Sequence, residues 1–263
     1  AVFLGLVVVV VLGPLAWLGL TALTPVGEFG RGFSLPHHLT AANFLTIFAE
    51  VRLARFLLNS VVVGLATTAL CLALGTPVAF ALACLRVRGR TIILAATLVI
   101  AMFPPIAIVS PVYLLARALG WRDTWIGLVM VDTTFALPLT IWIMTHFFLR
   151  LPRELLQAAR VDGCTAWQAM RHVALPLSAP GFTTAALLVF IATWNEFLFA
   201  YSLTATPRAR TVPVAIALFP GLHEIPWGEI AAAALVVLVP VLVLVFLCER
   251  YIVAGLTAGA VKG

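Results

Sequence analysis

Long runs of apolar residues alternate along the chain with short polar stretches. A helix needs about 20 predominantly apolar residues to span a bilayer. Six segments reach this length, and each is apolar on every face, which makes the short alternating strands of a membrane barrel a poor alternative. We therefore predict an all-α membrane protein with six transmembrane helices. They are expected at about Val2–Leu23, between Arg55 and Arg86, between Arg90 and Arg117, and at about Trp125–Leu149, Pro180–Leu203 and Ile230–Cys248.

The composition excludes the main soluble functions. Of the 263 residues, 63% are hydrophobic and only 10% are charged, and the mean hydropathy is +1.14. A soluble domain carries about a quarter charged residues. The net charge of +6 comes from basic residues scattered singly between apolar runs, without the basic stripe of a nucleic-acid binder. A soluble enzyme and a nucleic-acid-binding protein are both excluded.

The distribution of basic residues indicates which connections face the cytoplasm. Six spans place both termini on one side, and that side holds nine of the 16 basic residues against seven on the other. The positive-inside rule favours the first side as cytoplasmic. Trp121, Trp125 and Trp227 flank the opposite side, as interfacial anchors do. The nine basic residues are Arg86, Arg88, Arg90, Arg150, Arg153, Arg160, Arg171, Arg250 and Lys262.

The N-terminal run argues against a signal peptide, and the cysteines argue against a disulfide framework or a metal site. Ala1–Gly27 is too long for the apolar region of a signal peptide and lacks a basic flank, so we expect a transmembrane helix there. Because the chain opens on Ala1 and not on Met, we expect a short basic segment before it. The cysteines form no CxxC pair, and we expect free thiols without a disulfide or a metal site. They are Cys71, Cys84, Cys164 and Cys248.

Prolines interrupt several of the predicted spans. Each proline removes a backbone donor and kinks its helix, which a membrane protein tolerates where protein or a water-filled cavity satisfies the freed groups. Irregular packing is one interpretation, and a solute path between kinked helices is the interpretation we favour. The prolines are Pro77, Pro104, Pro105, Pro111, Pro138 and Pro240.

The connection between the fourth and fifth spans, residues 150–180, carries the most specific pattern. Pro152 suits the start of a helix, and Gly163 suits its end. Thr165 and Gln168 fit a capping box for a second helix, which Leu175-Pro176 is expected to stop. The pattern predicts two short helices joined by a tight turn, projecting from the membrane. Ala158 and Ala159 would let a partner surface approach closely, whereas an ordinary amphipathic connector is the plainer alternative.

This loop resembles the EAA loop of ABC-importer permeases. The matching pattern is Gln157-Ala158-Ala159, three residues, Gly163, nine residues, Val173, one residue and Leu175-Pro176, with Asp162 before the glycine. In that family the loop is the coupling helix that docks into a groove on the ATPase subunit. The resemblance implies an ATPase-coupling role for Gln157, Ala158, Ala159, Asp162, Gly163, Leu175 and Pro176. Gln157 stands where the family usually has Glu, so an ionic role does not carry over to this position.

Other segments extend the resemblance over roughly residues 56–263. Phe56–Ser60 is similar to the start of the permease core, and Pro111-Val112-Tyr113 with Ala118-Leu119-Gly120 is similar to its third span and outer turn. Thr193–Phe197, which contains Trp194-Asn195-Glu196, resembles the Trp-Asn segment of sugar-importer permeases. The tail Ile252–Gly263 is similar to the terminus of the maltose/trehalose-type G subunit.

The resemblance implies an ABC type I importer permease fold whose coupling loop and C-terminus are cytoplasmic, in a bacterial inner or plasma membrane. Residues 1–55 would form the first transmembrane helix and an external loop, and residues 56–263 the permease core with the coupling loop 150–180. The implied substrate is an α-linked disaccharide such as trehalose or maltose, with an oligosaccharide or glycerol phosphate as alternatives. The implied partners are a second homologous permease, two ATP-binding subunits and an external substrate-binding protein.

Two carboxyl residues, Asp132 and Glu196, fall inside the predicted spans, and Asn195 precedes the second. At 1.5 Å per residue, Asp132 and Glu196 lie in the outer part of the membrane. A carboxylate facing lipid costs about 2.5–3.5 kcal/mol or more, so both are expected to face protein or water. With Asn195 they would hydrogen-bond to sugar hydroxyls while Trp194 or Phe197 stacks on a ring, or they would bond to neighbouring helices. Both interpretations stay open for Asn195 and Glu196, and the structural one is favoured for Asp132.

The sequence lacks the chemistry of an enzyme. Its only lysine is Lys262, so there is no GxxxxGK[ST] phosphate loop, and ATP hydrolysis would belong to a partner. We expect no catalytic residue, no cofactor and no metal site. His146 is read as a helix-terminal hydrogen bonder, and the pairs His37-His38 and His223-Glu224 suggest no site. An ion-coupled secondary transporter and a membrane-embedded hydrolase are the rival classes.

Overall fold

The structure of the chain is a computed structural model that describes residues 2–25, 28, 38–85, 87–219 and 225–260. Within these ranges every regular element is a helix. His37, Arg86, His223, Glu224, Lys262 and the last residues of the tail lie outside the described part. The elements are α1 (Val2–Ala22), α2 (Ala42–Ala49), α3 (Leu53–Cys84), α4 (Arg90–Met102), α5 (Pro105–Ala118), α6 (Trp125–Leu149), α7 (Arg153–Val161), α8 (Ala166–Ala169), the π-helical turn η2 (Met170–Ala174), α9 (Leu175–Leu177), α10 (Ala179–Trp194), α11 (Leu198–Leu203), α12 (Val212–Ala217) and α13 (Trp227–Ala260).

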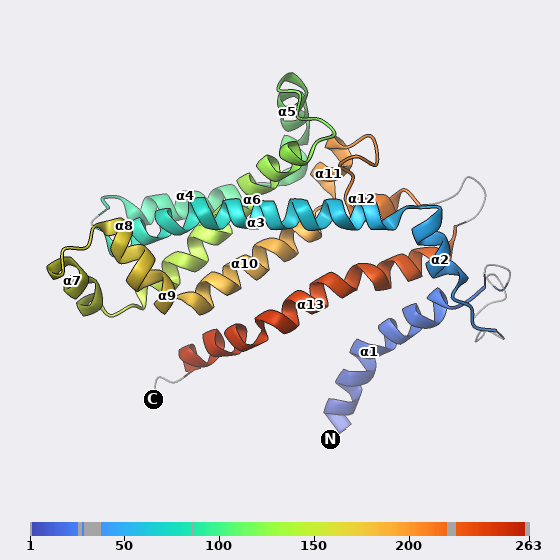
Figure 1. Cartoon of the computed structure of the whole chain (residues 1–263), viewed down its shortest axis with the longest axis horizontal. Coiled ribbons are helices and arrows are strands. Elements are labelled where there is room, and N and C mark those ends of the chain that lie inside the picture. The colour runs from blue at the N-terminus through green and yellow to red at the C-terminus, as the bar shows by residue number, and fades with distance from the viewer. Residues whose placement is uncertain (1, 26–27, 29–37, 86, 220–224, 261–263) are drawn as a thin grey trace.

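Helix α3 is the axis of the molecule, and α6 and α10 pack along it (Figure 1). Small residues allow this close approach, as is usual between membrane helices. A Cβ atom added at Gly75 of α3 would come within 2.8 Å of the Thr140 side chain of α6. One added at Gly64 would come equally close to Phe190 of α10. These two glycines therefore fix how tightly α3 can pack on both neighbours.

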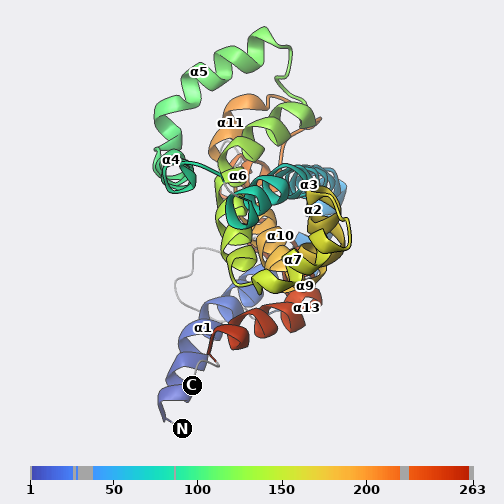
Figure 2. The same cartoon turned by 90° about the vertical axis from the view of Figure 1, so that its left-hand side faces the viewer.

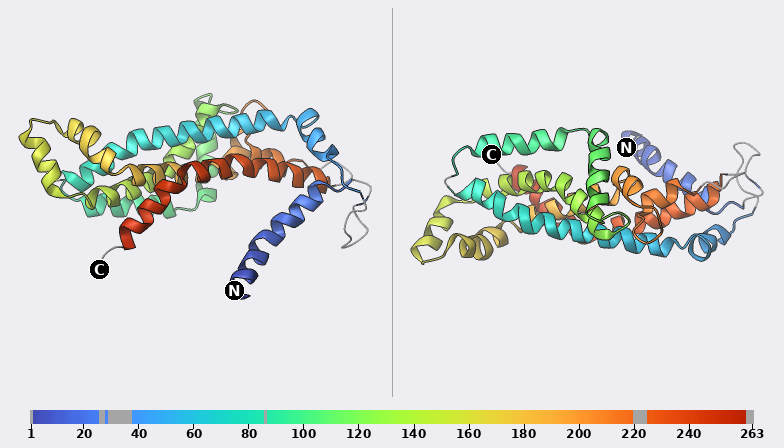
Figure 3. Two further views of the ribbon diagram at one scale, coloured as in Figure 1. Left: turned by 60° about the horizontal axis from the view of Figure 1, so that its bottom comes forward. Right: turned by 90° about the horizontal axis from the view of Figure 1, so that it is seen from above.

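The two terminal helices pack against each other at one end of the molecule. Ala22 at the end of α1 and Ile47 of α2 lie in a cluster with Ala231, Ala232 and Ala233 of α13. Away from this cluster α1 diverges from the bundle, as Figure 2 and the left view of Figure 3 show. Its residues from Gly5 to Trp17 are exposed, with apolar side chains that suit lipid or another membrane subunit.

Four of the six predicted spans are single helices long and apolar enough to cross a membrane. They lie in α1, α3, α6 and α13. Two bent pairs raise the number to six if each pair is one span. The helical membrane fold is therefore confirmed, although two of the predicted spans are not continuous.

The third predicted span, between Arg90 and Arg117, is broken. Helices α4 and α5 meet at an angle of 89°, so that α5 projects from the bundle in Figure 1 and crosses it in the right view of Figure 3. Pro104 and Pro105 lie at the break, where their fixed φ angles and missing amide hydrogens end one helix and start the next. By contrast, Pro77, Pro138 and Pro240 lie inside helices that continue past them.

The prediction of one continuous helix for the fifth span, Pro180–Leu203, is wrong. Helix α10 ends at Trp194, Asn195 forms its C-cap, and a separate helix α11 begins at Leu198. The apolar run hides this break because Glu196 is its only charged residue and the segment contains no proline after Pro180. The sixth span is longer than the predicted Ile230–Cys248, since α13 starts at Trp227 and continues to Ala260.

Candidate functional site

The loop between α6 and α10 is a compact helical element at one end of the bundle (Figure 1). Helix α7 ends at Val161 with Asp162 as its C-cap, and Gly163 makes the turn with a φ of +83°. The predicted capping box starts α8, because the Thr165 amide donates to Gln168 Oε1 at 2.8 Å and the Gln168 amide donates to Thr165 Oγ1 at 3.3 Å. The prediction of two helices joined by a tight turn is therefore confirmed.

Leu175-Pro176 does not stop the second helix as the sequence predicts. The helical path runs from α8 through the π-helical turn η2 and α9 to Leu177, and it bends by 83° into α10. Pro176 lies at the start of α9, directly after η2. A π-helical turn widens the backbone locally, which relieves the clash between a proline ring and the preceding turn. The chain therefore turns at Ser178 and not at the proline.

The two alanines of the loop have different environments. Ala159 is buried, 5% exposed, in a cluster with Phe148, Met170 and Ala174. Gln157 and Ala158 are exposed, as are Asp162 and Gly163 at the turn. Only Ala158 of the pair is therefore accessible to a partner, whereas Ala159 packs the loop onto the ends of the spans.

Two exposed apolar side chains add to the accessible surface of this loop. Val161 is 88% exposed and Trp167 is 59% exposed. Sequence analysis did not single them out, although both are apolar residues in an otherwise polar stretch. Val161 lies next to the turn at Gly163, whereas Trp167 lies beside apolar residues of α3 such as Pro77. Exposed large apolar side chains of this kind are typical of a protein or membrane interaction surface.

A second candidate site is a pocket of about 580 Å³ between α6, the α4–α5 break and the α10–α11 break. Asp132 of α6 and Glu196 both line it, so the structure brings these two predicted residues together. Asp132 is 6% exposed, and its Oδ1 atom has no hydrogen-bond partner. Aromatic and apolar side chains form most of the remaining wall: Ala101, Pro105, Ile106, Phe135, Ala136, Leu139, Ala192, Phe197, Leu198 and Phe199, together with Thr193.

Glu196 has a structural role that is visible in its hydrogen bonds. Its Oε1 atom accepts from the Phe199 amide at 2.7 Å, and its Oε2 atom accepts from the Ala200 amide at 2.9 Å. These are free donors of the first turn of α11, and a carboxylate at this position also suits the helix dipole. Glu196 therefore holds α11 in place at the edge of the pocket.

Trp194 and Asn195 do not line this pocket. Trp194 is 3% exposed and stacks on Phe190 at 5.4 Å between ring centroids. The Asn195 side chain is exposed and donates to the Ile191 carbonyl at 2.8 Å. Of the predicted aromatic residues, Phe197 lines the pocket and Trp194 packs inside the chain.

The other end of α3 holds a polar cluster that sequence analysis missed. The Asn59 Nδ2 atom donates to the carbonyl oxygens of Pro207 at 3.1 Å and Arg210 at 2.8 Å. Its Oδ1 atom accepts from Trp125 Nε1 at 3.0 Å. Asp123 accepts from the amides of Ala205 and Thr206 and from the Thr206 hydroxyl. These bonds fix the segment 204–211 against the start of α3.

Asp123 lies outside the spanning helices, between α5 and α6. Partial burial alone would raise the pKa of its carboxyl group. The hydrogen bonds from Thr206 and Ala205, with the nearby Arg208, outweigh burial and lower this pKa below its usual value. Asp123 is therefore a charged anchor for the segment 204–211.

The structure supports the plain interpretation of the remaining candidates. His146 Nδ1 lies 2.8 Å from the Trp142 carbonyl near the end of α6, as a helix-terminal hydrogen bonder does. Among the described residues, no three His, Cys, Asp or Glu side chains are placed to hold a metal ion. The four cysteines are free thiols.

A polytopic helical bundle with broken spans, a largely apolar pocket that holds two carboxyl groups, and a projecting helical loop has the architecture of a membrane transport protein. The fold matches the crystal structure of a bacterial ABC transporter involved in the import of the acidic polysaccharide alginate, with a TM-score of 0.80 and 21% identity over 95% of this chain and 94% of that one.

The chain belongs to the family described as binding-protein-dependent transport system inner membrane component, whose model matches residues 73–257. It is 45% identical to the trehalose transport system permease protein SugB of Mycobacterium tuberculosis, over 98% of this chain and 95% of that protein. It is 36% identical to the trehalose/maltose transport system permease protein MalG of Thermococcus litoralis, over 98% and 94% of the two chains. The chain is therefore a membrane permease subunit of an ABC importer, and not an enzyme.

Proposed function

We propose that this permease moves an α-linked disaccharide, trehalose or maltose, into the cytoplasm. The observation that carries the proposal is the 45% identity to a trehalose permease along nearly the whole chain. The same similarity to a trehalose/maltose permease, at 36%, supports the same class of substrate. The energy would come from ATP hydrolysed by partner subunits, because the chain has no phosphate loop.

The assembly we propose contains a second homologous permease, two ATP-binding subunits and an external substrate-binding protein. Membership of a binding-protein-dependent family supports the last of these partners. The exposed apolar faces of α1 and α4 support a second membrane subunit, since α4 has no buried residue and α1 is largely uncovered. We place the coupling loop and the C-terminus in the cytoplasm of a bacterial cell, as the basic residues favour.

The loop 150–180 is our proposed ATPase-coupling element. Gln157, Ala158, Asp162 and Gly163 would meet the ATPase, because they are exposed on the projecting part of the loop. Ala159, Leu175 and Pro176 would transmit the movement, since Ala159 packs onto the ends of the spans and Leu175-Pro176 precedes the bend into α10. A displacement of the loop would then move α10 and the pocket at its far end.

The pocket that contains Asp132 is our proposed part of the substrate path. The free Oδ1 atom of Asp132 would accept a hydrogen bond from a sugar hydroxyl, and Phe197 would stack on the ring. Glu196 would shape the pocket by capping α11. Trp194 and Asn195 would support the path from the end of α10, where they hold the break between the two helices.

The test is uptake by the complete transporter in liposomes that contain ATP. We expect labelled trehalose to accumulate only when ATP is inside and the binding protein is outside, and the purified permease alone to hydrolyse no ATP. Melting of the binding protein against a panel of disaccharides and oligosaccharides would identify the sugar. Uptake driven by an ion gradient without ATP would contradict the proposal.

A further inference from the structure

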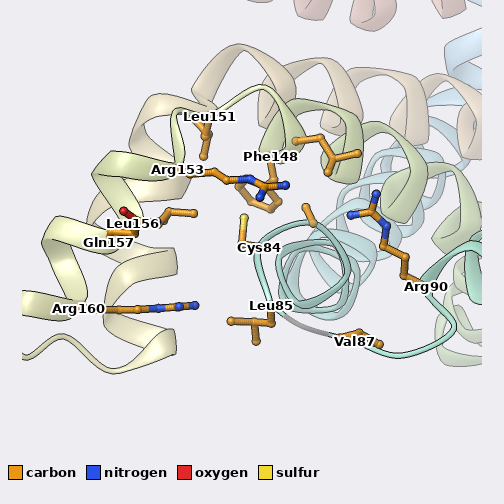
Figure 4. A pocket seen from close by; sticks show the side chains of 12 residues that line it. Cys84, Leu85, Val87, Arg90, Phe148, Leu151, Arg153, Leu156, Gln157 and Arg160 are labelled. Atoms are coloured by element: carbon orange, nitrogen blue, oxygen red, sulfur yellow. The ribbon is translucent and has the colours of Figure 1, made fainter.

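A basic pocket lies where α7 meets the ends of α3, α4 and α6 (Figure 4). Its volume is about 440 Å³. Three arginines line it, namely Arg90 at the start of α4 and Arg153 and Arg160 on α7. The lining contains no acidic residue, and its other polar side chains are those of Gln157 and Cys84.

The three arginine side chains converge on the pocket from two sides. In Figure 4, Arg153 and Arg160 point from α7 toward the end of α3, and Arg90 directs its guanidinium group toward Arg153. Arg153 and Arg160 are two turns apart on α7, with Gln157 between them on the same face. The structure records no ion pair for these arginines in the part of the chain that it describes. Like charges gathered in this way repel one another, so an anion between them would be stabilised.

The rest of the wall shows what kind of anion would fit. Leu85, Phe148, Leu149 and Leu156 give the pocket an apolar side. It lies at the ends of α3 and α6, two helices long and apolar enough to cross a membrane, and at the start of α4. The ends of spanning helices lie near the lipid headgroups. Two residues after Arg90, α4 exposes the apolar side chain of Ile92, which is 75% exposed. A ligand that combines a phosphate with apolar chains would place the phosphate at the arginines and its apolar part against the apolar side of the pocket.

We propose that this pocket binds the phosphate group of an anionic phospholipid. Guanidinium groups match phosphate oxygens with paired hydrogen bonds, and basic pockets between transmembrane helices are known to take anionic headgroups. The bound lipid would join α7 to α3 and α4, which links the projecting loop to the membrane. The site requires only that the chain spans a bilayer, so it does not depend on the proposed sugar or on the proposed coupling role.

The experiment compares the complete transporter in mixed micelles of dioleoyl phosphatidylglycerol with the same transporter in dioleoyl phosphatidylcholine. The pocket variant is Arg90→Gln/Arg153→Gln/Arg160→Gln. The matched control is Arg88→Gln/Arg150→Gln/Arg171→Gln, which removes three charges from the same side of the molecule at exposed residues outside the pocket. We expect the Tm of the wild type and of the control to be several degrees higher in phosphatidylglycerol than in phosphatidylcholine. We expect the pocket variant to lose most of this rise and to bind the lipid at least tenfold more weakly by native mass spectrometry.

Further arms separate other occupants of the pocket. Inorganic phosphate and ATP at the same concentration are expected to leave the Tm unchanged, and an equal rise with either would overturn the lipid assignment. An equal loss in the control variant would do the same, because it would show a diffuse charge effect. If the triple variant does not assemble, Arg90→Gln alone is expected to weaken lipid binding about threefold. Release of the ATPases by the pocket variant with its lipid preference intact would show that an acidic side chain of the partner fills the pocket instead.

Discussion

At the scale of single residues, a substitution at Gly163 tests backbone conformation alone, because a larger side chain there meets no neighbour. Its φ is +83°, and an added Cβ atom would meet no heavy atom within 4 Å. A β-branched residue in this conformation costs about 1–3 kcal/mol of backbone strain although there is space for it. We expect Gly163→Val to insert normally, to lose its ATPase subunits during purification and to show little sugar uptake. Co-purification of the ATPases and uptake in liposomes measure both effects.

The chain offers a matched control for this variant. Gly120, between α5 and α6, has a φ of +68° and equally open surroundings. Gly120→Val is expected to cost similar strain and to keep its ATPases, because it lies far from the loop. Asn tolerates positive φ better than Val, so Gly163→Asn should recover part of the lost coupling. Normal transport by Gly163→Val would show that the loop is only a connector.

Asp132 gives the second prediction at this scale. Its buried Oδ1 atom has no partner, so Asp132→Leu removes an unsatisfied polar group at similar side-chain size and is expected to leave the Tm unchanged or slightly raised. If this oxygen binds a sugar hydroxyl, uptake should fall about tenfold, the equivalent of 1.4 kcal/mol. The measurement is the initial rate of uptake at several sugar concentrations.

The control for Asp132 is Thr134→Val on the same helix. Thr134 is exposed and bonds only to the Met130 carbonyl of its own helix, so uptake should stay at the wild-type rate. Wild-type uptake by Asp132→Leu would assign Asp132 to packing, which is the role that the sequence favours.

The turn and the helix cap of the loop 150–180 could be predicted from the sequence, whereas the tertiary contacts of its residues could not. The capping box at Thr165 and the turn at Gly163 depend on residues within a few positions of each other, so their pattern predicts them. The burial of Ala159 depends on Met170 and Phe148, which the fold brings to it. Likewise, nothing local indicates that Asp132 of α6 and Glu196 after α10 line the same pocket.

At the scale of elements, Asp123 gives a prediction about pH. Its carboxylate holds the segment 204–211, and its pKa is lowered by the hydrogen bonds from Thr206 and Ala205. A lowered pKa means that the stabilisation is complete above the ordinary value near 3.8 and is lost as the pH falls through the lower, folded value. We expect Asp123→Asn to reduce the free energy of unfolding by about 1 kcal/mol at neutral pH. The difference in Tm between wild type and variant should be constant from pH 8 to pH 5 and shrink below about pH 4.

A control of similar chemistry is available for Asp123 within the same turn. Arg122→Gln removes an exposed charge next to it that lies over the face of Tyr113, and its effect on Tm should not vary over this acidic range. A difference that stays constant down to pH 3.5 for Asp123→Asn would show that the hydrogen bonds, and not the charge, carry the stabilisation.

Helix continuity is the feature of the elements that composition predicts least well. Hydropathy locates the apolar segments, because the bilayer requires their length. It does not distinguish a proline that a helix absorbs, such as Pro138, from the pair at Pro104 and Pro105 that turns the chain by 89°. The break at Asn195 has no proline at all and is stabilised by the Glu196 cap of α11. These outcomes depend on neighbouring helices and on hydrogen bonds across the break.

At the scale of the whole molecule, α3 sets the distance between the segment 204–211 and the loop 150–180. Its 32 residues extend about 48 Å at 1.5 Å per residue, longer than the hydrocarbon core of about 30 Å. Asn59 near its start binds the segment 204–211, and Phe80 near its end packs with Phe148 and Ala159 beneath the coupling loop. The two segments therefore belong to opposite sides of a membrane that α3 crosses.

Their sidedness can be measured with single cysteines. Replacing Cys71, Cys84, Cys164 and Cys248 by Ala gives a background without thiols, to which Val161→Cys or Arg208→Cys is added; both positions are exposed. Because the positive-inside rule places the side with more arginines in the cytoplasm, Arg208→Cys should react with a membrane-impermeant maleimide in intact spheroplasts. Val161→Cys should react only after the membrane is opened or in inverted vesicles. The reverse pattern would place the loop outside the cell, where no ATPase could bind it, and labelling of both cysteines from one side would mean that α3 does not cross the membrane.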